Sequence, residues 1–145
     1  LLLPRATVIT PNIPEAEVLA DMAITDRTAM TAAAARIYER THSAVLMKGG
    51  HSVDDANDLL VDGAGARWFH GRRIATTNTH GTGCTLSSAI ASLRPRRAAW
   101  LQTVRDAKAY LTDALEHADS LGVGHGHGPV HHFHALWREV DGAHE

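Results

Sequence analysis

The amino-acid sequence predicts an α/β fold, on three observations. Residues 43–47 form a run that is continuously apolar after Ser43, which is typical of a strand buried on both faces of a sheet. Residues 28–40 carry an apolar stripe at the spacing of an amphipathic helix, made up of Met30, Ala33, Ala34, Ile37 and Tyr38. The expected elements run in the order strand, helices, strand, hairpin strands and two helices. That order is typical of an α/β fold with a mixed sheet.

Local signals predict the elements of the first half. Residues 6–9 form a β-rich run that Pro11 stops, which indicates a short strand ending in a loop. Pro14 suits the first turn of the helix that follows, because an N–H group has no intrahelical partner there. We expect that helix to bury one face, which consists of Ala16, Val18 or Leu19, and Met22.

Glycine turns and a proline divide the second half. Residues 59–61, 67–69 and 72–74 are predicted to form three short antiparallel strands. Gly81 opens a helix that Pro95 ends. A longer helix follows, and its predicted buried side consists of Leu101, Val104, the stem of Lys108, Leu111, Leu115 and Ala118. The Gly- and His-rich tail is predicted to be a loop before a last short helix.

Composition excludes several function classes. The chain of 145 residues is 44% apolar and 21% charged, with a net charge of −2, so it has no charge pattern for nucleic acid or for a membrane surface. No apolar run approaches the ~20 residues that span a bilayer. The single cysteine, Cys84, allows no intrachain disulfide and fits a reducing cytosol, so we expect a cytoplasmic protein.

The first residues predict a fragment. Residues 1–3 are three leucines without an initiator Met, and they resemble the end of an element that began upstream. A trimmed but complete small domain is the alternative.

The segment around Gly81, Thr82 and Gly83 is the most informative motif. Two glycines separated by Thr precede a helix of small residues. Glycines let backbone amides turn toward one point, and a helix N-terminus adds roughly half a positive charge there. The motif therefore predicts an anion hole for a phosphoryl group in transfer. A capped helix after a glycine turn is the alternative. The segment is not a Walker motif, because no Lys-Ser/Thr pair follows Gly83.

Cys84 falls in the first turn of the same helix, where a thiolate is favoured. Beside a bound anion, it could act as the base that takes the proton of an attacking hydroxyl. Phosphoryl transfer requires little more than positioning, charge compensation and such a base. Inert packing of the thiol is the alternative.

Three polar residues follow two of the predicted strands. Asn12 and Glu15 lie at a strand–helix junction, where ligands bind in open α/β sheets, and Glu15 could hold a water-ligated Mg²⁺. Lys48 ends the strand at 43–47 and could reach a phosphate. The alternatives are a helix cap formed by Asn12 with Glu15, and a solvated lysine. If the three residues do form a phosphate–Mg²⁺ site, they should converge near Gly81.

The histidines of residues 124–134 suggest a metal site. Zinc sites with ordered geometry usually show helix-spaced His or Cys pairs, however, and no Glu or Cys lies close by in the sequence. We therefore expect no metal site here.

These motifs resemble those of ribokinase-like kinases. Residues 12–15 match the Asn-x-x-Glu element, and residues 80–85 resemble the Gly-x-Gly-Asp loop, with Cys84 in place of Asp. A cysteine at this position is the pattern of hydroxymethylpyrimidine/phosphomethylpyrimidine kinases and of the pyridoxal kinases nearest to them. Four stretches look like the pyrimidine enzyme and occur in the expected order, namely residues 9–12, 45–51, 78–87 and 123–134.

The resemblance implies a fold and a domain organisation. The chain should be the C-terminal portion of a ribokinase-like three-layer α/β/α fold with a mostly parallel sheet. Residues 1–145 should form one partial kinase domain, which lacks the first half of the family's protein. The histidine-rich tail then becomes a family feature near the nucleotide end of the fold.

The resemblance also implies an activity and site residues. ATP would phosphorylate 4-amino-5-hydroxymethyl-2-methylpyrimidine and then its monophosphate, for thiamine synthesis. Gly81, Thr82 and Gly83 would bind the transferring phosphate, and Cys84 would be the base. Glu15 would organise Mg²⁺, whereas the nucleotide would contact Asn12, Lys48 and Thr79. The full-length protein is expected to be a homodimer.

Two alternatives to this function remain open. One is a pyridoxal kinase of the same subgroup, which shares the Cys84 loop. The other is a catalytically inactive nucleotide-binding fragment, because a truncated sheet would expose a strand edge and an apolar helix face.

Overall fold

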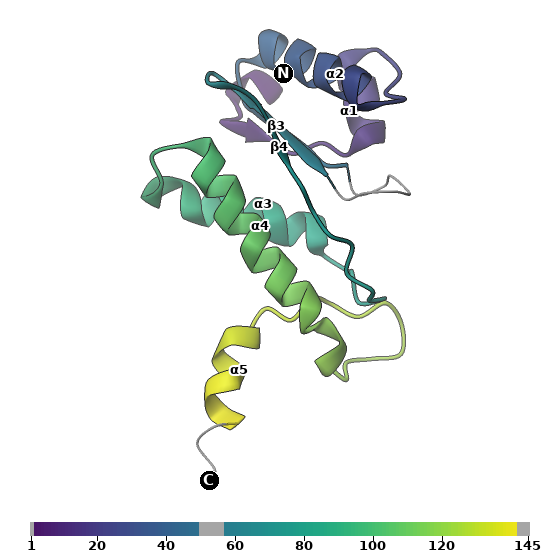
Figure 1. The fold of residues 1–145 in the computed structure, drawn as a ribbon, viewed down its shortest axis with the longest axis vertical. Helices are drawn as coiled ribbons and strands as arrows, with labels where there is room; N and C mark the ends of the chain where they lie inside the picture. Colours follow the sequence, from purple (N-terminus) through teal and green to yellow (C-terminus); the bar gives the residue numbers. More distant parts are fainter. Residues whose placement is uncertain (1, 50–56, 142–145) are drawn as a thin grey trace. The chain divides into compact units, whose positions relative to one another are not determined.

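The computed structural model describes residues 2–49 and 57–141, and the side chains among these up to residue 137. Gly50 and His51, which belong to the stretch 45–51 that resembles the kinase family, therefore lie outside the described residues. The chain divides into two compact units, Leu1–Arg73 and Ile74–Glu145 (Figure 1). Each unit contains its own packed helices. The expected three-layer arrangement stays a prediction.

The first unit contains a four-stranded mixed sheet. Its strands are β1 (Val8–Ile9), β2 (Ala44–Met47), β3 (Asp58–Asp62) and β4 (Gly65–Phe69), in the order β1-β2-β3-β4. β1 and β2 pair in parallel, whereas β2–β3 and β3–β4 pair antiparallel. The α/β class with a mixed sheet is confirmed. The expectation of a mostly parallel sheet does not hold for these four strands, because two residues join β3 to β4 and so short a connection allows only antiparallel pairing.

The prediction of a third hairpin strand at residues 72–74 is wrong. The structure has no strand there. The amide of Gly71 instead donates to Oδ1 of Asn57, at 3.2 Å. The side chain of Asn57 thus takes the place of a neighbouring strand as the hydrogen-bond partner of the Gly71 backbone, and β4 is the last strand of this sheet.

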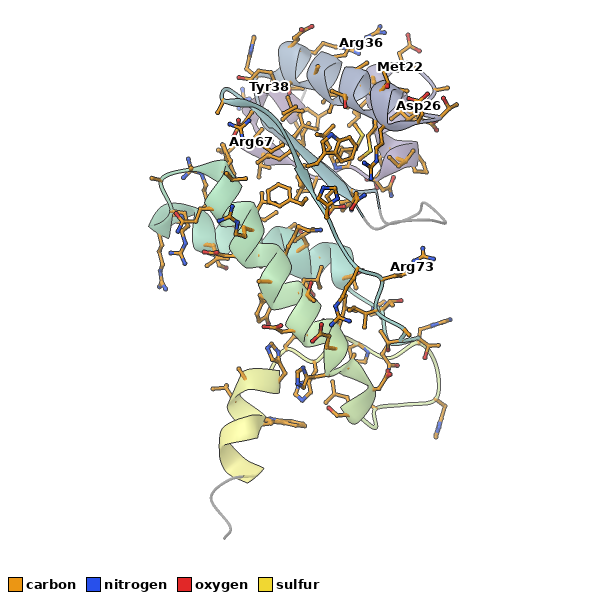
Figure 2. All side chains as sticks on the ribbon, in the orientation of Figure 1. Met22, Asp26, Arg36, Tyr38, Arg67 and Arg73 are labelled. Carbon is orange, nitrogen blue, oxygen red and sulfur yellow. The ribbon has the colours of Figure 1, made fainter. Side chains whose placement is uncertain are left out.

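Two helices pack in the first unit, and α2 (Arg27–Thr41) contacts both β2 and β3. Asp26 caps α2 by accepting a hydrogen bond from the amide of Ala29 at 2.7 Å (Figure 2). The predicted stripe of α2 is confirmed, with Tyr38 only half-buried. The shorter helix, α1 (Ile13–Ala20), lies beside α2 (Figure 1).

Of the two residues expected as alternatives at one buried position of α1, Leu19 is half-buried and packs against the core, whereas Val18 is not buried. Val18 is 81% exposed, whereas Ala16 and Ala20 are fully buried. Alanines one turn apart let α1 approach its neighbours closely, and this places Val18 on the opposite face. The core of the unit consists of Ile9, Ala16, Ala20, Met30, Ala33, Ala34, Ile37, Val45, Met47, Leu59 and Val61.

Gly49 is required where the chain leaves β2. Its amide donates to Oδ1 of the buried Asp58 at 3.0 Å, and an added Cβ would collide with the carbonyl oxygen of Asn57. Gly49→Ala should therefore destabilise the protein by about 1–3 kcal/mol, the usual cost of overpacking. Urea unfolding measures this change.

Gly63→Ala is the matched control for this prediction. An added Cβ at Gly63 meets only the Tyr38 hydroxyl, at 3.4 Å, which is ordinary contact. Equal unfolding midpoints for the two variants would contradict the close approach at Gly49.

The second unit is built from helices. They are α3 (Thr82–Leu93), α4 (Trp100–Glu116) and α5 (His134–Asp141), with short 3₁₀ turns at Arg94–Arg96 and Ala118–Ser120. α3 packs against α4. The predicted start of α3, its end next to Pro95 and the last short helix are confirmed. No helix in residues 2–49 and 57–141 combines the length and apolar character needed to cross a membrane.

The buried side of α4 differs in part from the predicted one. Its buried residues are Thr103, Val104, Ala107 and Ala114, and Ala118 is buried just beyond its end. The predicted residues Leu101, Lys108, Leu111 and Leu115 are only half-buried. The small side chains of α4 lie where this helix packs most closely against its neighbours, and the larger side chains lie on either side of them.

Candidate active site

The first turn of α3 forms at the predicted place. Gly81 is its N-cap, with φ 81° and ψ 6°, in the left-handed region that favours glycine. An added Cβ would meet no atom within 4 Å, so the backbone conformation and not the space requires glycine. No side chain of the described residues caps this helix.

Two amides of this turn remain available to a ligand. The amide of Thr82 donates to the carbonyl oxygen of Thr79 at 3.3 Å, and that of Thr85 donates to Gly81 at 2.8 Å. The amides of Gly83 and Cys84 have no hydrogen-bond partner among the described residues. Two unpaired N–H groups at a helix N-terminus can bind an anion.

Cys84 is exposed on this turn. Behind it, the hydroxyl of Ser87 donates to the carbonyl oxygens of Gly83 and Cys84, both at 3.0 Å. Thr85 and Leu86 are buried and anchor the helix. The helix is therefore buried on one face only, and its first turn presents the thiol and the two amides to solvent.

The histidine-rich tail pairs with the segment that precedes α3. Pro129 and His80 form a parallel bridge, in which the amide of His80 donates to the carbonyl oxygen of Gly128 at 3.1 Å. Nδ1 of His127 lies 3.0 Å from the carbonyl oxygen of Thr77. The tail thus supports the approach to Gly81, a role that the sequence did not indicate.

The buried tail histidines pack against α4: the amide of His131 donates to the carbonyl oxygen of Ala114 at 2.9 Å, and the ring centroids of His134 and Tyr110 lie 5.9 Å apart. The ring of His134 stacks on that of His117, with centroids 5.4 Å apart, and His131 meets the edge of Trp137 at 4.6 Å. Burial lowers the pKa of His131, and the nearby His134 and His117 lower it further, so His131 is neutral near pH 7. Within the described residues, no three His, Cys, Asp or Glu side chains are grouped so that they could hold a metal ion.

The structure brings Asn12, Glu15 and Lys48 together in the first unit. The amide of Asn12 donates to Oε2 of Glu15 at 2.8 Å, and that of Glu15 donates to Oδ1 of Asn12 at 2.9 Å. These two bonds form a capping box. Lys48 bridges Asn12 in parallel, and its amide donates to Pro11 at 2.8 Å.

The capping box leaves one carboxylate oxygen of Glu15 available to a ligand. Glu15 is exposed, and its Oε1 has no hydrogen-bond partner in the part of the chain that the structure describes. A carboxylate of this kind suits Mg²⁺, which usually binds one or two protein carboxylates together with water and phosphate oxygens. Thr79 and the Gly81–Cys84 turn lie in the second unit. The convergence of the two groups stays a prediction.

Comparisons with known proteins point to one enzyme family. The family model described as phosphomethylpyrimidine kinase matches residues 1–131. A hydroxymethylpyrimidine/phosphomethylpyrimidine kinase of Escherichia coli is 51% identical over 139 residues, which are 94% of this chain and 52% of the relative. A thiamine biosynthesis bifunctional protein of Geobacter sulfurreducens is 45% identical over 132 residues, which are 90% of this chain and 26% of that protein.

Solved structures resemble this chain at the level of the fold. The ADP complex of Bacillus subtilis pyridoxal kinase matches with a TM-score of 0.81 and 32% identity, over 93% of this chain and 51% of that one. A phosphomethylpyrimidine kinase of Clostridium difficile matches with a TM-score of 0.66 and 35% identity, over 79% of this chain and 45% of that one. The chain spans about half the length of the first of the curated relatives.

Proposed function

Because this chain belongs to the phosphomethylpyrimidine kinase family, we propose that the enzyme containing it is an ATP-dependent kinase of thiamine biosynthesis. It phosphorylates 4-amino-5-hydroxymethyl-2-methylpyrimidine and then the resulting monophosphate. The observation that carries the proposal is the first turn of α3, where an exposed thiol lies beside two unpaired amides.

The transfer step assigns a role to each residue of this turn. The substrate hydroxyl oxygen attacks the γ-phosphorus of ATP, its proton passes to the Cys84 thiolate, and the bond to the ADP oxygen breaks. The turn of Gly81, Thr82 and Gly83 holds the transferring group, with the amides of Gly83 and Cys84 donating to its oxygens. In the second phosphorylation the acceptor is a phosphate oxygen, which is largely ionised already.

The first unit supplies the nucleotide and metal contacts in this proposal. Mg²⁺ would neutralise charge on the ATP phosphates, and Glu15 would hold it through Oε1. Lys48 compensates phosphate charge, while Asn12 holds Glu15 in place through the capping box. Thr79 contacts the nucleotide from the second unit. These roles rest on the motifs and on the availability of Glu15.

A pyridoxal kinase is the second candidate. The observation that favours it is the fold match to the Bacillus subtilis pyridoxal kinase, with the higher of the two TM-scores. Sequence identity to the pyrimidine enzymes is higher, however, at 51% against 32%. We therefore place the pyrimidine substrate first.

Release of ADP in a coupled assay distinguishes the two functions. The enzyme that contains residues 1–145 is offered hydroxymethylpyrimidine, its monophosphate or pyridoxal, each with ATP and Mg²⁺. We expect the highest kcat/KM for the two pyrimidines. A higher kcat/KM for pyridoxal would favour the second candidate, and no ADP release with any of the three would contradict both.

We further propose that residues 1–145 form part of one ribokinase-like kinase domain in a cytoplasmic homodimer. Support comes from the family match over residues 1–131 and from the single free thiol, which suits a reducing compartment. Light scattering of the enzyme containing this chain measures its oligomeric state.

A further inference from the structure

The side chain of Asn78 connects three segments of the second unit. Its Oδ1 accepts a hydrogen bond from the amide of Gly128, at 2.9 Å. Its Nδ2 donates to Oδ1 of Asp119 at 2.9 Å and to the carbonyl oxygen of Ala118 at 3.4 Å. Both amide hydrogens of Asn78 are therefore used, and its oxygen is fixed by the tail.

The neighbours of Asn78 extend this connection. The hydroxyl of Thr76 donates to Oδ1 of Asp119 and accepts a hydrogen bond from the amide of Asn78 at 3.0 Å. Gly128 contacts the same segment twice, because its carbonyl oxygen accepts from His80. An added Cβ on Gly128 would collide with the side-chain amide group of Asn78, so the close approach of these two residues requires glycine.

This network ends beside the proposed phosphate-binding turn. His80, which the tail holds, directly precedes Gly81, and the unpaired amides follow at Gly83 and Cys84. Among the side chains that the structure describes, none caps the turn itself. The orientation of its first N–H groups therefore depends on how the preceding segment is held, and small displacements of a reacting group reduce rates strongly.

We propose that Asn78 is a positioning residue for phosphoryl transfer: it fixes residues 76–80 against Asp119 and Gly128 and so orients the first turn of α3. This inference rests on the proposed function. It predicts that Asn78 affects the transfer step more than the binding of the pyrimidine.

Three single variants and one double variant test the contacts separately. Asn78→Ala removes all the bonds of the side chain, and Gly128→Ala displaces the side chain without altering it. Asn78→Asp keeps the acceptor for Gly128 but puts a carboxylate against that of Asp119. Adding Asp119→Asn to Asn78→Asp restores a donor–acceptor pair with reversed polarity, because the new amide can donate to the new carboxylate.

We expect each single variant to lower kcat on the order of tenfold, with the KM for hydroxymethylpyrimidine nearly unchanged. The double variant should recover most of the loss in Asn78→Asp. Ser120→Ala is the matched control, because it removes a hydrogen bond to His117 at 2.7 Å in the same segment without contacting Asn78. Circular dichroism shows whether each variant is folded at the assay temperature.

A second readout does not depend on the substrate. Cys84 is the only cysteine of the 145 residues, so alkylation of this chain by iodoacetamide reports on Cys84 alone. Asn78→Ala should change the alkylation rate at pH 7 several-fold, because the first turn of α3, which carries the exposed Cys84, is then no longer held in one orientation.

The kcat and the alkylation rate of Cys84 together distinguish a failure of the proposed function from a failure of the positioning role of Asn78. If the wild-type enzyme phosphorylates neither pyrimidine, the proposed function fails, and the alkylation rate alone decides on Asn78. Folded single variants with wild-type kcat and wild-type alkylation rates would overturn the positioning role. A kcat loss in Asn78→Asp that Asp119→Asn does not reverse would also overturn it.

Discussion

Replacing Cys84 with serine is expected to lower kcat for hydroxymethylpyrimidine by about 10²–10⁴-fold, the usual cost of losing a general base. Serine has nearly the same volume but is far less acidic, so it cannot take the proton of the substrate hydroxyl at neutral pH. Affinity for ATP should stay nearly constant, since the backbone amides of the turn are retained. Steady-state phosphorylation by the enzyme containing this chain measures both quantities.

Two further variants make this test specific. Cys84→Asp should retain part of the activity, because the ribokinase-like loop that this segment resembles carries Asp at this position. Ser88→Ala, at an exposed position one turn along α3, is the matched control and should be fully active. Near wild-type kcat in Cys84→Ser would show that the thiol only packs, and that another group takes the proton.

Replacing Glu15 with glutamine should weaken the activation of the enzyme by Mg²⁺ by about 10–100-fold. Glutamine can replace glutamate in a capping box, so α1 should keep its cap while the negative charge is lost. The expected result is a higher Mg²⁺ concentration for half-maximal activity, with an unchanged unfolding midpoint.

Glu39→Gln is the control for this substitution, because it removes the same charge from an exposed position of α2. Its Mg²⁺ dependence should match that of the wild type. If Glu15→Gln also matched the wild type, Glu15 would be a helix cap and no more. A lowered unfolding midpoint would indicate that the amide does not replace the carboxylate in the cap.

Local signals in the sequence predicted most of the fold. Pro14 and Asn12 marked the start of α1, the alanine-rich stripe identified the buried face of α2, and Gly81 marked the start of α3. These features depend on residues within one or two turns of each other. Periodicity and capping chemistry are therefore enough to locate them.

Packing partners decided the features that the sequence did not predict. Val18 and Ala20 both fit a helix face, and only the neighbours of α1 determine that Ala20 is the buried one. In α4 the leucines Leu111 and Leu115 dominate the periodic pattern, yet Ala107 and Ala114 lie at the closest approach. Hydrophobicity alone does not distinguish the centre of an interface from its border.

The role of the tail required contacts that are distant along the chain. Asn78 and Gly128 are 50 residues apart, and Asn78 and Asp119 are 41 apart. No local pattern links them, although both Asn78 and Gly128 lie within the stretches that resemble the kinase family. An asparagine three residues before Gly81 was the one available signal, and its partners could come only from the structure.

We propose that Glu15 and the first turn of α3 act on one nucleotide. The most direct measurement replaces Mg²⁺ with paramagnetic Mn²⁺ in a complex with AMP-PCP, and follows the amide signals of Gly83 and Cys84 in the enzyme containing this chain. We expect both signals to broaden in the wild type, and to broaden far less in Glu15→Gln. Signals of Gly83 and Cys84 that stay sharp, while those around Asn12 and Glu15 broaden, would show that the two groups do not bind the same nucleotide.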